Sequence, residues 1–198
     1  MCSRYEIRSR PEALARRFRL DETAPDLARP EVRPTDLAPI VVRDAGGVRR
    51  ARAARFGLNV TWDKMPVINA RAETLRQKPT FRPLLGNRCL IPASAYFEWH
   101  QDGRARRRIR ISLAEDELIG FAGLFDANRF VIITCAPAAT IAHVHDRMPV
   151  ILPPESEERW LDRANDDLAR LLSPYAGAIS TAEEKPRPSP QGDLFAFG

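Results

Sequence analysis

Residues 89–99 read CLIPASAYFEW, and they contain two short apolar runs, 89–91 and 95–99, that decide the fold class. Three similar runs follow, at 108–113, 118–124 and 130–135. Turn-forming residues such as Gln101, Asp102 and Gly103 separate several of them. Short apolar or alternating runs bounded by turn signals are typical of β-strands, and close spacing favours antiparallel neighbours. This region therefore predicts an antiparallel sheet as the core.

The segments before this region add a helix, a connection and a hairpin. Residues 11–20 begin with proline and carry Leu14 and Phe18 on one side, which predicts a short amphipathic helix. Prolines recur between residues 21 and 39, where we expect an ordered connection without helix. Residues 44–47, Asp-Ala-Gly-Gly, stand between two apolar-bearing runs and predict a β-hairpin turn.

The segments after residue 135 predict a helical cover and a tail. Residues 155–161 and 166–172 have helical patterns, and the first follows two prolines. After residue 180 the chain is polar and proline-rich. The expected fold class is α+β: a single domain, residues 1–180, with an antiparallel, partly closed, barrel-like sheet and peripheral helices. Residues 181–198 are expected to form a flexible C-terminal tail.

The composition is that of a globular protein and excludes several other classes of protein. The 198 residues suit one domain, and 44% hydrophobic with 29% charged residues is ordinary globular usage. The net charge is +5, with 28 arginines against three lysines, which is compatible with nucleic-acid binding. No apolar run is long enough to span a membrane, so we expect a cytoplasmic protein. Three widely spaced cysteines and three histidines indicate neither a disulfide framework nor a metal site, and no cofactor is expected.

Cys2 is informative because of its position. Removal of Met1 would leave an α-amine and a thiol on one residue, a 1,2-aminothiol. An α-amine with a pKa of about 7.7–8.0 is partly neutral at physiological pH and can form a Schiff base with an aldehyde. The neighbouring sulfur can then close a thiazolidine ring. On position alone, Cys2 could equally be an incidental residue at a frayed terminus.

Four segments together carry a family resemblance. They are Met-Cys-x-Arg at 1–4, Asn-Ala-Arg-x-Glu at 69–73, Phe-Glu-Trp at 97–99 and His-x-Arg-Met-Pro at 145–149. In this order they resemble the SRAP family, the SOS response-associated peptidases, which act as covalent sensors of abasic sites in single-stranded DNA. The resemblance spans roughly residues 1–180. Ser3, Phe56 and Ala95 depart from the usual family residues.

The resemblance implies a DNA repair function with four reacting residues. Mature Cys2 would attack the ring-opened sugar of an abasic site and form a thiazolidine DNA–protein crosslink. Glu98, between two aromatic residues, would relay protons, because desolvation favours its neutral form. Asn69 would orient the Cys2 terminus, and His145 would donate a proton to the sugar. The alternatives are that Glu98 is a surface carboxylate, that Asn69 belongs to a turn and that His145 is structural. His143 is expected to be structural.

Further residues are candidates for contacts with single-stranded DNA. The arginines that accompany the reacting segments suit flanking phosphates, with structural salt bridges as the alternative: Arg4, Arg71 and Arg147. Three aromatic residues could stack on bases, with core packing as the alternative: Phe56, Trp62 and Trp99. The arginine-rich run at 104–108 is expected to be a solvated hairpin tip with some attraction for phosphate.

The tail suggests one protein partner. Residues 191–195, Gln-Gly-Asp-Leu-Phe, resemble the peptide with which many bacterial DNA-processing proteins dock on the sliding clamp, so Gln191, Leu194 and Phe195 are candidate contacts. We expect a monomer, associated with the nucleoid.

Two other functions remain open at the level of sequence. One is a cysteine peptidase or self-processing amidohydrolase that uses Cys2 as its nucleophile. The other is a noncovalent binding module for single-stranded DNA. The three functions have different requirements at position 2. Crosslinking to an abasic site needs both the amine and the thiol, a peptidase needs only the thiol, and a binding module needs neither.

Overall fold

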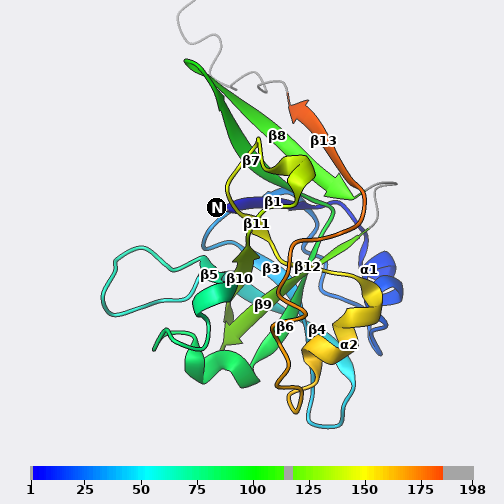
Figure 1. Ribbon diagram of the computed structural model, residues 1–198. Helices are drawn as coiled ribbons and strands as arrows, with labels where there is room; N and C mark the ends of the chain where they lie inside the picture. Colours follow the sequence, from blue (N-terminus) through cyan, green and yellow to red (C-terminus); the bar gives the residue numbers. More distant parts are fainter. Residues whose placement is uncertain (1, 114–117, 185–198) are drawn as a thin grey trace, which may run out of the picture.

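The computed structural model describes residues 2–113 and 118–184 (Figure 1). The candidate clamp-binding residues Gln191, Leu194 and Phe195 lie outside this range. The strands are β1 (Arg4–Ile7), β2 (Arg29–Val32), β3 (Leu37–Arg43), β4 (Arg49–Phe56), β5 (Asn69–Arg71), β6 (Arg88–Ala93), β7 (Ala95–Asp102), β8 (Ala105–Leu113), β9 (Ile119–Asp126), β10 (Arg129–Cys135), β11 (Met148–Pro149), β12 (Ile151–Leu152) and β13 (Ile179–Glu184). The helices are α1 (Pro11–Phe18) and α2 (Pro154–Leu161), with 3-10 turns η1 (Ala72–Thr74), η2 (Arg82–Gly86) and η4 (Ala139–Ile141).

One sheet closes into a ring of strands. Its order is β11-β10-β4-β3-β6-β9-β12, and a further pairing of β10 with β9 closes a ring of five strands, β10, β4, β3, β6 and β9. The predicted partly closed sheet is thereby confirmed, as is the hairpin between β3 and β4. Two pairings of β10, with β4 and with β5, are parallel. Apolar patterns indicate which residues form strands but carry no information on strand direction, so the sequence could not distinguish these pairs.

The second sheet is antiparallel, with the order β13-β8-β7-β1-β2. The hairpin of β7 and β8 extends away from the ring, with β13 along one side (Figure 1). β13 runs to Glu184, so residues 181–184, which the sequence assigns to the tail, pair with β8. Their polar side chains suit the exposed edge of a sheet, where backbone pairing needs no apolar residue.

Aromatic side chains fill the core between the two sheets. The Tyr5 ring meets Phe56 edge-on with centroids 5.7 Å apart, and Phe56 stacks on Phe130 at 5.3 Å. Phe56 is completely buried. The expectation that Phe56 stacks on DNA bases is therefore wrong: it ends β4 with its ring directed into the core, where no base can reach it.

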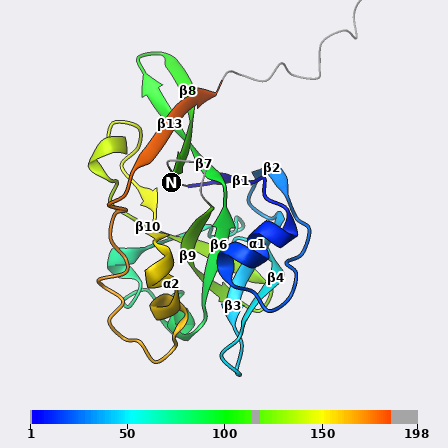
Figure 2. The ribbon, with the colours of Figure 1, turned by 90° about the vertical axis from the view of Figure 1, so that its right-hand side faces the viewer.

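The two helices lie at the outside of the ring (Figure 2). Both begin at a proline, which suits the first turn because its backbone nitrogen needs no partner there. Residues 166–172 form turns, so the predicted second helix in this region is wrong. The Asn165 side chain accepts a bond from the Asp167 amide at 3.2 Å, a local contact that competes with helix formation. Within residues 2–113 and 118–184, no helix is long and apolar enough to cross a membrane.

The ring requires a glycine where β9 lies between β6 and β10. A Cβ on Gly123 would lie 2.9 Å from the Val131 carbonyl oxygen and 3.0 Å from the Cys89 sulfur. We expect Gly123→Ala to lower the free energy of unfolding by about 1–3 kcal/mol, because the backbone of β10 must shift. Gly86→Ala is the control, since a Cβ there meets nothing within 4 Å. Equal midpoints for both variants in urea titrations would contradict this account.

Candidate active site

Four predicted site residues come together where the two sheets meet. Cys2 lies two residues before β1, and Glu98 lies on the adjacent strand β7. Asn69 begins β5, which belongs to the ring, and His145 lies shortly before β11. Because β1 pairs Arg4 with Phe97, the same register continued places Ser3 opposite Glu98. The N-terminal end of the chain lies between the β7–β8 hairpin and the ring (Figures 1 and 2).

A hydrogen bond between the sheets holds Cys2. The Asn69 side-chain amide donates to the Cys2 carbonyl oxygen at 3.0 Å. The other end of that amide, Asn69 Oδ1, is buried without a hydrogen-bond partner among the described residues. A buried acceptor without a partner is costly, so this oxygen offers a place for a donor near Cys2.

Burial controls the protonation of Glu98. Its side chain is almost fully buried, and desolvation raises the pKa of the carboxyl group to about 7, with a smaller upward effect from the Asp146 carboxylate. Glu98 Oε2 lies 3.6 Å from His145 Nε2. Near neutral pH this carboxyl group can therefore hold or release a proton beside an imidazole.

The surroundings of His145 suit both of its protonation states. The Arg147 amide donates to His145 Nδ1 at 3.0 Å, which assigns the proton of the neutral ring to Nε2, on the side of Glu98. Asp146 Oδ1 lies 2.8 Å from the same Nδ1 and can accept a proton from the charged ring. Desolvation lowers the pKa of His145, and the Asp146 carboxylate opposes that effect. The neutral ring therefore predominates at neutral pH.

The Cys2 thiol is completely buried. Desolvation raises its pKa well above the usual value, and the charge of Glu98 raises it further. The thiol is therefore protonated at neutral pH. A thiol in this state is a weak nucleophile until a proton acceptor comes within reach.

A cavity of about 370 Å³ opens above these residues. Its walls are formed by Ser3, Arg4, Glu98, Trp99, Arg106 and His145. Its polar lining and its position next to Cys2 make it the candidate reaction chamber. Among the described residues, no three His, Cys, Asp or Glu side chains lie close enough together to hold a metal ion.

The arginines predicted to bind DNA fall into two groups. Arg4 lines the cavity and lies 3.4 Å from Glu31, whereas Arg71 is exposed at the end of β5 without an ion-pair partner in the described part of the chain. Arg147 forms two bonds to Glu73, at 2.7 and 2.9 Å, and a third to the Thr134 carbonyl oxygen at 2.6 Å. Arg147 thus forms the salt bridge that was the structural alternative for it.

The two tryptophans differ in their relation to the cavity. Trp99 is half-buried on β7 and lines the cavity, while Trp62 is 68% exposed in the loop between β4 and β5. The sequence did not single out Asp146, beside the His145 ring, and it placed Arg106 only in an arginine-rich hairpin tip, not in the cavity wall. The hairpin register could have found Arg106, because the turn at 102–105 places it diagonally across from Trp99.

Cys2, held by Asn69, thus lies next to the buried Glu98 carboxyl group and the His145 imidazole. The chain belongs to the SRAP family: the family "SOS response associated peptidase (SRAP)" matches residues 1–184. This confirms the family resemblance of the sequence motifs.

Named relatives and solved structures agree with this assignment. Abasic site processing protein YoqW of Bacillus subtilis (strain 168) is 36% identical, with 88% of this chain and 88% of that protein covered. Abasic site processing protein YedK of Escherichia coli (strain K12) is 33% identical over 50% of this chain and 49% of that protein. A crystal structure of a Bacteroides thetaiotaomicron protein shares the fold, with a TM-score of 0.82, 22% identity, and coverage of 93% of this chain and 92% of that chain.

The raised pKa of Glu98 has a consequence for stability. Between pH 4.5, the usual value, and about 7, the folded protein keeps a proton on Glu98 that the unfolded chain releases. The free energy of unfolding therefore falls as pH rises through this window, by about 1.4 kcal/mol per unit of pKa difference. We expect Glu98→Gln to remove this part of the pH dependence in urea titrations. The exposed Glu155→Gln should behave like the wild type, and identical pH dependence in all three proteins would refute the burial account.

Proposed function

We propose that this protein processes abasic sites in single-stranded DNA by forming a thiazolidine crosslink through Cys2 after removal of Met1. The observation that carries the proposal is the Asn69–Cys2 hydrogen bond, which holds Cys2 next to the Glu98–His145 pair. The names of the relatives YoqW and YedK support abasic-site processing as the broader activity.

The proposed reaction begins at the amine. The neutral α-amine of Cys2 adds to the aldehyde carbon of the open sugar and forms a carbinolamine. Protonation of the carbinolamine hydroxyl releases one water and gives an iminium ion. The Cys2 sulfur then adds to the same carbon, and its proton leaves. The net result is a new C–N bond, a new C–S bond and one released water molecule.

Glu98 and His145 have suitable positions and protonation states for the two proton transfers. Glu98, with a pKa of about 7, is partly protonated at neutral pH and can protonate the departing hydroxyl group. The carboxylate that this transfer leaves on Glu98 can take up the proton that the thiol loses, and the Nε2 proton of the neutral His145 ring, 3.6 Å away, stabilises that carboxylate. The free Asn69 Oδ1 can accept a bond from the α-amine and orient its lone pair.

The remaining predicted contacts have complementary roles in this proposal. Arg4 and Trp99 line the cavity, so they would contact the nucleotides next to the abasic sugar. The exposed Arg71 and Trp62 would contact more distant nucleotides of the DNA strand. Arg147 holds the segment of His145 to η1 through Glu73, which is a positioning role.

The buried thiol favours this proposal over a cysteine peptidase. A peptidase mechanism starts with attack by a thiolate, and burial of Cys2 disfavours that form. In the aldehyde reaction the amine attacks first, and the sulfur reacts only with a highly electrophilic iminium carbon. The same Cys2 thus suits the proposed order of steps.

Substitution of Cys2 tests the proposal directly. We expect the Met1-processed wild type to give a shifted band on a denaturing gel with an abasic single-stranded oligonucleotide, and none with undamaged DNA. Cys2→Ala keeps the α-amine but lacks the sulfur, so it should form only an imine that becomes stable after borohydride reduction. The control is Cys89→Ala, which removes another buried thiol. A borohydride-independent crosslink in Cys2→Ala would refute the role of the thiol.

His145 and His143 form a matched pair for the proton-transfer step. We expect His145→Ala to slow crosslinking about 100-fold, the usual effect of losing an acid–base group. His143→Ala should react at the wild-type rate, because its exposed ring contacts His100, with centroids 6.1 Å apart, and does not line the cavity. Single-turnover rates on the abasic oligonucleotide measure both. Equal rates for the two variants would remove His145 from the mechanism.

A further inference from the structure

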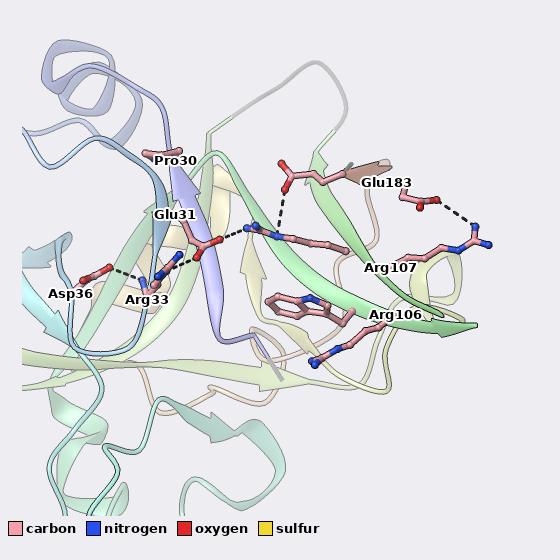
Figure 3. A pocket seen from close by; sticks show the side chains of 10 residues that line it. Pro30, Glu31, Arg33, Asp36, Arg106, Arg107 and Glu183 are labelled. Carbon is pink, nitrogen blue, oxygen red and sulfur yellow. Dashed lines mark hydrogen bonds and ion pairs between the residues drawn. The ribbon is translucent and has the colours of Figure 1, made fainter. Parts of the chain in front are cut away.

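A second, larger cavity adjoins the candidate reaction chamber. This groove has a volume of about 760 Å³, within the range of about 300–1,000 Å³ that small-molecule sites occupy. It lies between β2 and the following loop on one side and β8 and β13 on the other (Figure 3). Trp99 and Arg106 line both the groove and the chamber, so the two cavities meet at this pair.

Most of the arginines in the groove are already paired with acidic groups. Glu31 accepts from both Arg33 and Arg108, and Arg107 lies 3.0 Å from Asp102 and 3.4 Å from Glu183 (Figure 3). The far part of the groove is therefore electrically balanced. An incoming anion would have to displace carboxylates from these guanidinium groups.

Arg106 is different from these neighbours. It is exposed and has no acidic partner among the described residues. Its guanidinium carbon lies 5.1 Å from the centroid of the Trp99 ring, a stacking distance that orders the side chain. A guanidinium held on an aromatic ring keeps its N–H groups available for a phosphate.

We propose that Arg106 binds the phosphate of a nucleotide next to the abasic site and directs the strand from the chamber into this groove. Trp99, which forms the shared wall of the two cavities, would hold the Arg106 guanidinium group toward that phosphate. This inference rests on the proposed function. It assigns the groove to the nucleotides on one side of the lesion only, because the groove meets the chamber at one place, the Trp99–Arg106 pair.

Salt dependence of binding tests the phosphate contact without any chemistry. For an undamaged single-stranded oligonucleotide, we expect Arg106→Ala to weaken binding about 10-fold, the loss of one charge-assisted contact. The slope of log K against log salt should decrease in magnitude by about 0.7, one phosphate on a single strand. Arg104→Ala removes the same charge two residues away but outside the groove. Equal slopes for Arg106→Ala and the wild type, or equal changes in both variants, would overturn the proposal.

The one-sided assignment has its own test. Two oligonucleotides carry the abasic site at opposite ends, so that all nucleotides lie on its 3′ side in one and on its 5′ side in the other. We expect Arg106→Ala to slow crosslinking about 10-fold with one substrate at limiting concentration, and to leave the other within twofold. Equal slowing of both would overturn the groove as a one-sided path. If the wild type crosslinks neither substrate, the proposed function fails, and the salt slope still decides the phosphate contact.

Discussion

The position of β1 between β2 and β7 is the constraint on which the candidate site depends. A strand next to a chain terminus normally frays, but here both of its edges are paired. The buried Glu6 side chain adds ion pairs to Arg8 and Arg110, at 2.9 and 2.7 Å, and so ties β1 to β8 across β7. With β1 fixed in this way, Cys2 cannot move far from Asn69 and Glu98. The fold thus restrains the segment that carries Cys2.

Burial also supplies the chemistry of the site. The same desolvation raises the pKa of Glu98 and of the Cys2 thiol and lowers the pKa of His145. As a result, the Glu98 carboxyl group, whose pKa normally lies about two units below that of an imidazole, can hold a proton near neutral pH beside a neutral His145 ring. The thiol stays protonated at neutral pH, so in the proposed reaction it would follow the amine. One physical cause therefore sets both the acid–base pair and the order of the proposed steps.

Sequence patterns predicted the strands around residues 89–135 and the four central site residues, because both depend on local signals: apolar runs and short motifs. They failed where three-dimensional packing decides. A phenylalanine can pack in a core or stack on DNA bases, and the sequence does not distinguish these roles. The position of Phe56 at the end of β4, completely buried, shows that it packs in the core. Arg147 faces a glutamate that the sequence places 74 residues away. Similarly, Leu168 and Leu171 are buried, but the predicted helix that contains them does not form.

The arginine-rich composition has a different meaning in the structure from the one it has in the sequence. Many of these arginines hold elements together: Arg49 joins β4 to Glu157 on α2 at 3.0 Å, and Arg108 joins β8 to Glu31 on β2. Each such pair removes a positive charge from the set that can attract phosphate. A net charge of +5 therefore does not describe a uniformly basic surface. What matters for binding a strand is which guanidinium groups lack a carboxylate. Arg106 is one of them, and it stands where the reaction chamber meets the groove.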